Sequence, residues 1–121
     1  MTLQTHKDLK VWQESRNLVK EIYNLTAKFP KDEIYSLTAQ IKRSVISIPS
    51  NIAEGAARDS NKEYIHFLYI SLGSIAELDT QLIIARDLDF ISQKDFEEVS
   101  SRLDDIAKML MGLIKYRQTK L

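Results

Sequence analysis

Apolar residues recur at intervals of three and four along most of this 121-residue chain. The clearest run lies near the C-terminus, at Phe96, Val99, Leu103, Ile106, Leu110 and Leu113. Such spacing places apolar side chains on one face of an α-helix and is typical of the seam in a helical bundle. Only three glycines and two prolines interrupt the chain, and the alternation expected of strands is weak. The pattern therefore predicts an all-α fold.

Turn-forming residues divide this pattern into four helices, which we expect at residues 7–29, 33–58, 61–88 and 93–118. Pro30 ends the first helix, because the residue before a proline is disfavoured in the helical region. We expect Asp32 to cap the second helix, Ser60 the third and Ser92 the fourth. Joints this short force neighbouring helices to run antiparallel. We therefore predict one domain, residues 1–121, folded as an up-down-up-down four-helix bundle.

The sequence SIPSNIAEGAARDS carries two helix breakers and part of a polar row inside the second predicted helix. Pro49 removes a backbone donor, so we expect a kink there. Gly55 and its neighbouring alanines favour close packing of another helix, although glycine also commonly ends a helix. The polar row consists of Gln40, Ser44, Ser47, Asn51, Glu54 and Arg58. It is either a solvated face or a buried or interface seam, and the apolar residues on both of its sides favour the seam.

The third predicted helix carries a matching polar row at Ser74, Glu77 and Gln81. An antiparallel hairpin of the second and third helices sets Arg43 level with Glu77. We hypothesise a partly buried ion pair between these two side chains, whose loss would be costly. The alternative is that each is exposed and independent, in which case a pair would contribute little.

The chain carries no net charge, since 17 basic residues balance 17 acidic ones. Nucleic-acid binding without sequence preference usually shows as a basic excess, and the whole chain has none. After Asp105, however, the charged residues are all basic: Lys108, Lys115, Arg117 and Lys120. This basic C-terminal segment either complements the C-terminal dipole of the last helix, which is the commoner cause, or forms a nucleic-acid patch.

Cysteine is absent, so neither disulfides nor thiolate zinc sites are available. Polar residues follow Met1, so no signal peptide is visible, and no apolar run approaches membrane-spanning length. We therefore expect a cytoplasmic protein that has no membrane partner.

A catalytic constellation cannot be assembled from these residues. Glu63 and His66 form one Glu-x-x-His motif, whereas di-iron bundles use two such motifs and further glutamates. The other histidine, His6, lies in the N-terminal tail, so Glu63 is better interpreted as a cap partner and His66 as a surface residue. Phosphate-binding glycine loops and Gly-x-Ser-x-Gly motifs are also missing. We expect no enzymatic activity, no catalytic residue, no metal, no cofactor and no small-molecule substrate.

Three segments resemble a known family: DLKVWQESRNLVKEIYNLTAKFP, QIKRSVISIPSNIAEGAAR and FLYISLGSIAELDTQL. They are similar to the four-helix-bundle family first associated with intervening sequences in bacterial 23S ribosomal RNA genes. Within ISLGS, Ser71 and Leu72 stand where that family more often has alanine and a basic residue. This difference lowers the positive charge of the third helix.

The resemblance implies a small cytoplasmic bacterial protein that assembles as a ring-like homopentamer and has no enzymatic activity. The family is similar to the accessory protein of diversity-generating retroelements, a pentameric barrel thought to engage nucleic acid and a reverse transcriptase. With the polar rows, the resemblance predicts structural or interface roles for Arg43, Ser47, Pro49, Asn51, Glu54, Gly55, Arg58, Gly73, Ser74 and Glu77.

Two functions follow as expectations. The first is a homo-oligomeric accessory protein that binds RNA or DNA, since a ring multiplies the basic cluster of each subunit. The candidate nucleic-acid contacts are Lys7, Lys10, Lys42, Lys115, Arg117 and Lys120. The second is an adaptor ring that binds another protein and has no nucleic-acid role.

Overall fold

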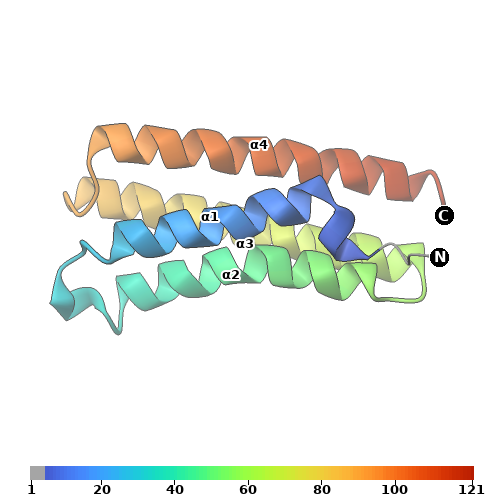
Figure 1. Cartoon of the computed structure of the whole chain (residues 1–121), viewed down its shortest axis with the longest axis horizontal. Helices are drawn as coiled ribbons and strands as arrows, with labels where there is room; N and C mark the ends of the chain where they lie inside the picture. The colour runs from blue at the N-terminus through green and yellow to red at the C-terminus, as the bar shows by residue number, and fades with distance from the viewer. Residues whose placement is uncertain (1–4) are drawn as a thin grey trace.

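A computed structural model describes residues 5–121 of the chain. Those residues form four α-helices and no strand: α1 (Lys10–Thr26), α2 (Leu37–Ala56), α3 (Asn61–Asp87) and α4 (Gln93–Gln118). Two short 3-10 turns, η1 (His6–Asp8) and η2 (Lys31–Glu33), precede α1 and α2. The helices alternate in direction, and η1, the α2–α3 joint and the C-terminus lie at the same end of the bundle (Figure 1). The predicted all-α four-helix bundle is confirmed.

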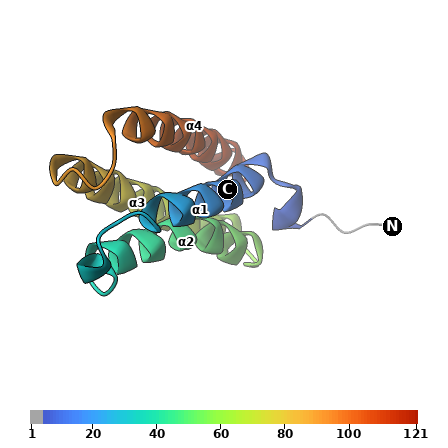
Figure 2. The same cartoon turned by 60° about the vertical axis from the view of Figure 1, so that its left-hand side comes forward.

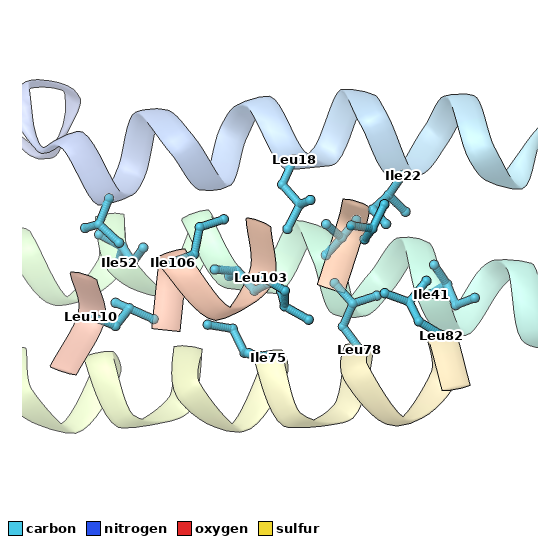
Figure 3. Close-up of a cluster of buried hydrophobic side chains, with 14 of the residues drawn as sticks. Leu18, Ile22, Ile41, Ile52, Ile75, Leu78, Leu82, Leu103, Ile106 and Leu110 are labelled. Atoms are coloured by element: carbon cyan, nitrogen blue, oxygen red, sulfur yellow. The ribbon is translucent and has the colours of Figure 1, made fainter. Parts of the chain in front are cut away.

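All four helices contribute to one apolar core. Its buried side chains point into the space between the helices (Figure 3) and include Leu18, Ile22, Ile41, Ile52, Ile75, Leu78, Leu82, Leu103, Ile106 and Leu110. For α2 and for most of α4 these are the residues that the three-and-four spacing selected. Burial of each such side chain stabilises the fold by about 1.5–3 kcal/mol relative to its exposure to water.

The sequence spacing predicts an inner face of the first helix at Leu9, Trp12, Val19, Ile22, Thr26 and Phe29, and the last three are buried. In the first part of α1 the buried residues are instead Val11, Ser15 and Leu18, whereas Trp12 and Val19 are half-buried. Ser15 satisfies its hydroxyl locally, donating to the backbone carbonyl of Trp12 at 3.0 Å. A small hydroxyl residue bonded in this way can lie inside the core, and the indole remains at its edge.

The first helix is shorter at both ends than predicted. Thr5 and Asp8 form a capping box, in which the Thr5 N–H donates to the Asp8 carboxylate at 3.1 Å. This box closes η1, and the extended conformation of Leu9 separates η1 from α1. At the other end, Phe29 N–H bonds the carbonyl of Thr26, three residues back, at 3.0 Å. That tighter turn ends α1 before the proline is reached.

The second helix begins four residues later than predicted, so the prediction that Asp32 caps it was wrong. Asp32 lies within η2, and Ser36 takes a non-helical conformation with φ −123° and ψ −102° immediately before α2. The Ser36 hydroxyl donates to the Glu33 carboxylate at 2.9 Å and makes no cap bond to α2. The joint after α1 therefore closes as a turn of its own.

The starts of α3 and α4 follow the sequence prediction. Ser60 accepts the N–H of Glu63 at 3.2 Å, and Ser92 accepts the N–H of Asp95 at 3.1 Å. Each serine accepts a hydrogen bond from one of the free N–H groups in the first turn of its helix, as an N-cap residue does. Helix α4 has the predicted bounds, and α3 ends one residue earlier than expected.

Candidate functional site

The two halves of the bundle carry opposite net charges. We call residues 5–17, 47–74 and 106–121 the basic end, which holds η1, the C-terminus and the α2–α3 joint (Figure 1). It contains nine Lys and Arg residues against five Asp and Glu residues, whereas the rest of the chain contains eight and twelve. The neutral total therefore masks a separation of charge along the bundle.

Aromatic rings lie beside several cations of the basic end. Distances from the cationic group to the ring centroid are 5.5 Å for Arg16–Trp12, 4.7 Å for Arg58–Phe67, 4.4 Å for Arg117–Tyr64 and 5.2 Å for Lys120–Tyr116. In such pairs the aliphatic stem covers apolar surface while the charge stays near water. Basic groups interleaved with aromatic rings are also the side chains that bind single-stranded nucleic acids.

Arg117 is enclosed between elements as well as charged. Its guanidinium lies over Tyr64, and its Nη1 donates to Oδ1 of Asn61 at 3.3 Å. A cavity of about 240 Å³ joins Arg117 and Tyr64 to the N-terminal turn at His6 and Asp8. Burial raises the pKa of Tyr64, and the positive charge of Arg117 opposes that rise. Arg117 therefore connects α4 to the start of α3.

The candidate nucleic-acid contacts divide into two groups. Lys7, Lys10, Lys115 and Lys120 are exposed at the basic end, together with the partly enclosed Arg117. Lys42 is the exception, because it lies in the first half of α2 with its ammonium 4.7 Å from the ring centroid of Tyr23. The fold thus brings five of the six candidates to one end.

An open cavity beside η1 was not foreseen from the sequence. It measures about 450 Å³ and is lined by Lys7, Trp12, Gln13, Arg16 and Asn17. The last four of these share the outer side of α1 at the spacing i, i+1, i+4 and i+5. The available signal was the presence of Trp12 and Arg16 one helical turn apart, but the apolar pattern assigns Trp12 to the core face.

The middle of the predicted polar row forms a seam between α2 and α3. Ser47 and Ser74 share a hydrogen bond of 2.8 Å, and Asn51 donates to the Ser47 hydroxyl at 2.9 Å. Ser71, which is fully buried, donates to the backbone carbonyl of Ile48 at 2.8 Å. For Ser47, Asn51 and Ser74 the expected seam is therefore real, and it lies within one subunit.

Gly55 and Pro49 have different outcomes. A Cβ at Gly55 would lie 2.9 Å from the Cβ of Phe67 and 3.1 Å from the backbone oxygen of Tyr64. Close packing of α3 on Gly55 is thus confirmed, although α2 also ends one residue later. Pro49 lies inside α2, which continues through it as one helix. The predicted kink at Pro49 stays a prediction.

The last two members of the polar row, and the two residues of the hypothesised ion pair, are exposed on the subunit. Glu54 and Arg58 pair with each other at 2.7 Å along α2, with exposed fractions of 52% and 40%. Arg43 and Glu77 are both exposed, and no ion pair joins them within residues 5–121. The hairpin sets them nearly level, but the expected buried pair is wrong because both side chains lie on the outside of the subunit.

Helix α3 presents apolar residues to solvent as well as to the core. The exposed fractions are 52% for Tyr69, 38% for Ile70, 42% for Ile84 and 52% for Leu88. Gly73 lies on the same side, and no atom would lie within 4 Å of a Cβ added there. We call these five residues the outer face of α3.

By length and composition alone, α3 is long enough and apolar enough to cross a membrane. The qualifying 18-residue window has a mean hydropathy of 1.3, and 28% of it is buried within the subunit. The sequence expectation concerned uninterrupted apolar runs, whereas this criterion averages hydropathy over the whole window. Polar residues scattered along α3 keep each apolar run short, while the average remains high. Core helices of soluble proteins pass the same test, so the result is weak evidence for a membrane.

Within residues 5–121, no three His, Asp or Glu side chains are grouped so that they could hold a metal ion. His66 is exposed, as predicted, with its ring centroid 5.5 Å from that of Phe67. Glu63 lies in the first turn of α3, where its N–H bonds Ser60.

Comparison with protein families identifies the group to which this fold and these motifs correspond. The model of the 23S rRNA-intervening sequence protein family matches residues 7–112. The chain belongs to this family. The resemblance inferred from Trp12, the SIPSNIAEG segment and Glu77 is therefore confirmed.

Among solved structures, the chain is similar to a Bacteroides thetaiotaomicron protein with unknown function from the S23 ribosomal protein family. The two share a TM-score of 0.81 and 26% sequence identity, over 87% of this chain and 95% of that one. No curated protein matches. These comparisons show membership of the 23S rRNA-intervening sequence protein family, and the descriptions of the family and of the solved structure name no activity.

Proposed function

We propose that this 23S rRNA-intervening sequence protein is a non-enzymatic, self-associating accessory protein that binds RNA or DNA in the cytoplasm. The observation that carries the proposal is the gathering of basic side chains at one end of a neutral chain. Phosphate contacts supply most of the affinity in sequence-independent binding, and they require a local cluster of cations rather than a basic total. Five predicted contacts lie at that end.

Self-association is supported by the outer face of α3. Tyr69 and Ile70 lie beside the open Gly73, and Ile84 and Leu88 form a second exposed apolar group further along; exposed apolar groups of this kind commonly mark interaction sites. Arg43 and Glu77 are exposed on neighbouring helices. In a self-associated protein, Arg43 of one copy would pair with Glu77 of a second copy. A closed ring would repeat the basic end around one axis and so concentrate its charge. The family resemblance implies five copies.

Salt dependence of binding tests the nucleic-acid role. Fluorescently labelled structured RNA and duplex DNA are titrated with the protein over a series of salt concentrations, and light scattering reports the oligomer. We expect binding that weakens steeply with salt, because each phosphate contact releases counterions. Absence of binding at micromolar protein near physiological salt would contradict the proposal, and a monomer at high concentration would contradict self-association.

Charge-neutralising variants provide the matched comparison. Lys115→Gln with Lys120→Gln removes two exposed charges from the basic end, whereas Lys28→Gln with Lys31→Gln removes two from the opposite end. We expect only the first pair to lower the slope of log affinity against log salt, by about one for each lost phosphate contact. An equal decrease of this slope in the two double variants would refute a binding site localised at the basic end.

A groove at the opposite end favours a second candidate function, an adaptor that binds another protein. The groove measures about 400 Å³, and Oε1 of Gln81 at its wall is buried without a hydrogen-bond partner among the described residues. Its other lining residues are Glu33, Ser36, Leu37, Gln40, Ile84 and Leu88. A pure adaptor would assemble normally but bind neither RNA nor DNA, even at low salt.

A further inference from the structure

The cavity beside η1 has the chemical character of a site for an unpaired nucleotide. We propose that it holds one base of a single-stranded nucleic acid, stacked against Trp12 or Arg16, with the adjacent phosphate on Lys7 or Arg16. The inference rests on the proposed function, because it assigns a particular binding mode to the basic end. Such a site would bind single strands in preference to duplexes, because the bases of a duplex are stacked on each other and cannot stack on protein side chains.

The walls of the cavity are cationic and lack a carboxylate. Lys7 and Arg16 both line it and are both exposed. The nearest acidic residues in sequence do not line this cavity. Asp8 accepts the N–H of Thr5 at 3.1 Å, and Glu14 lines a separate cavity beside Lys10. A phosphate placed at this cavity therefore meets two positive charges and no acidic wall residue.

An aromatic and guanidinium platform lies at the same place. The Trp12 indole lines the cavity, half-buried, and the Arg16 guanidinium lies 5.5 Å from its ring centroid. The His6 ring meets Trp12 edge-on at 5.0 Å and an interplanar angle of 69°, which fixes the indole from one side. Unpaired bases stack on aromatic rings and on arginine planes, and both surfaces are present here.

Two amide side chains supply groups suited to the edge of a base. Gln13 and Asn17 lie one helical turn apart in the cavity wall. The Gln13 amide nitrogen donates to the backbone carbonyl of Lys7 at 2.8 Å, which holds η1 against α1 and leaves the amide oxygen as an acceptor. Amides both donate and accept, as base edges do, whereas a site for phosphate alone needs only donors.

The size and position of the cavity agree with this occupant. Its volume of about 450 Å³ falls within the 300–1,000 Å³ typical of sites for small organic groups. The cavity adjoins η1 through Lys7. The ribbon in Figure 2 shows η1 at the same end of the bundle as the C-terminal end of α4. A strand whose base enters the cavity can thus continue over the other cations of the basic end.

The sole tryptophan of the chain provides a direct reporter. Trp12 fluorescence is followed while oligothymidylate is added, with an abasic oligodeoxynucleotide of equal length as the control that keeps the phosphates and removes the bases. We expect saturable quenching by oligothymidylate and none by the abasic strand, which should bind about 5- to 100-fold more weakly. Equal quenching and equal affinity for both strands would overturn the inference.

Variants that retain the reporter locate the site. Arg16→Gln should weaken oligothymidylate binding at least about fivefold, whereas Lys20→Gln, an equal loss of charge one turn further along α1, should change it less than twofold. Trp12→Phe and Trp12→Leu lack the reporter, so their binding is measured with fluorescently labelled strands. Trp12→Phe should retain the preference for bases over the abasic strand and Trp12→Leu should lose it, with thermal melting used to verify folding. Equal effects of Arg16→Gln and Lys20→Gln would contradict the site.

Failure of this inference is distinguishable from failure of the proposed function. If structured RNA binds with steep salt dependence but Trp12 fluorescence stays constant with every strand, the accessory role stands and the nucleotide site is refuted. If neither structured RNA, duplex DNA nor oligothymidylate binds, both proposals are refuted together.

Discussion

Gly55 of α2 and Phe67 of α3 approach so closely that a Cβ on the glycine would lie 2.9 Å from the Cβ of the phenylalanine. The backbone oxygen of Tyr64, at 3.1 Å, closes the same space. Gly55→Ala must therefore push α3 away, since neither contacting atom is the far end of a flexible side chain. We expect a loss of about 1–3 kcal/mol in the free energy of unfolding, measured by urea denaturation.

Gly112→Ala is the matched control for this prediction. A Cβ at that position meets no atom within 4 Å, and the residue lies in the interior of α4. Alanine is the better helix former, so this variant should gain about 0.5–1 kcal/mol. Stabilisation by both substitutions would show that α3 does not pack on Gly55 as described.

Ser71 should contribute to stability through its single long-range hydrogen bond. The side chain is fully buried, and its hydroxyl donates to the Ile48 carbonyl on α2 at 2.8 Å. Ser71→Ala should cost about 1 kcal/mol, because a buried bond between helices is lost. Thr80→Ala removes a hydroxyl that bonds its own helix at the exposed carbonyl of Ala76, and should change stability by less than about 0.5 kcal/mol. Equal effects in thermal melting would contradict the role of Ser71.

Helix existence, number and core pattern were accessible from the sequence because they depend on local spacing. Each apolar row on α2, α3 and α4 repeats for several turns, so one misplaced residue does not change the face. The boundaries at Leu9 and Ser36 were not accessible. They depend on particular bonds, the Thr5–Asp8 box and the Ser36–Glu33 contact, which compete with helix continuation and have no periodic signature.

The candidate site was predictable only where its residues are neighbours in sequence. The basic run after Asp105 was visible, but the charge separation of the whole bundle depends on antiparallel folding, which brings three distant segments to one end. The position of Trp12 at the edge of the core was missed because periodicity cannot tell the centre of an apolar face from its border. The seam at Ser47 and Ser74 was anticipated, since the same polar spacing occurs on both helices.

Arg43 and Glu77 provide a test of self-association by charge reversal. Both side chains are exposed and unpaired with each other in the subunit, and our proposal brings one copy's Arg43 to another copy's Glu77. Arg43→Glu and Glu77→Arg should each shift the protein toward monomers in light scattering, because each sets like charges together. The double variant should restore association by about tenfold or more over either single variant.

The control for this experiment is a reversal outside the outer surface of α2 and α3. Lys94→Glu alters an exposed residue in the first turn of α4 and should leave the oligomer unchanged. A double variant that remains as dissociated as the singles would contradict a direct pair. Single variants that assemble like the unchanged protein would exclude both residues from the contact.

Tyr64 should make the folded state sensitive to alkaline pH. Burial raises its pKa above the ordinary value of 10.0, and the charge of Arg117 only partly opposes that rise. In the unfolded chain the phenol is exposed and ionises first, so the unfolded state loses a proton that the folded state retains. Below pH 10 this titration therefore leaves the free energy of unfolding at its full value. The free energy of unfolding then declines as pH rises through the raised pKa of Tyr64 in the folded state.

Tyr64→Phe removes this titration and keeps the ring in contact with Arg117. Urea denaturation at intervals of pH above 10 should show a shallower loss of unfolding free energy in the variant than in the unchanged protein. Arg117→Gln should act in the opposite direction, because loss of the nearby cation raises the pKa of Tyr64 further and widens its difference from the unfolded chain. Identical pH dependence in all three proteins would show that Tyr64 does not ionise differently in the folded bundle.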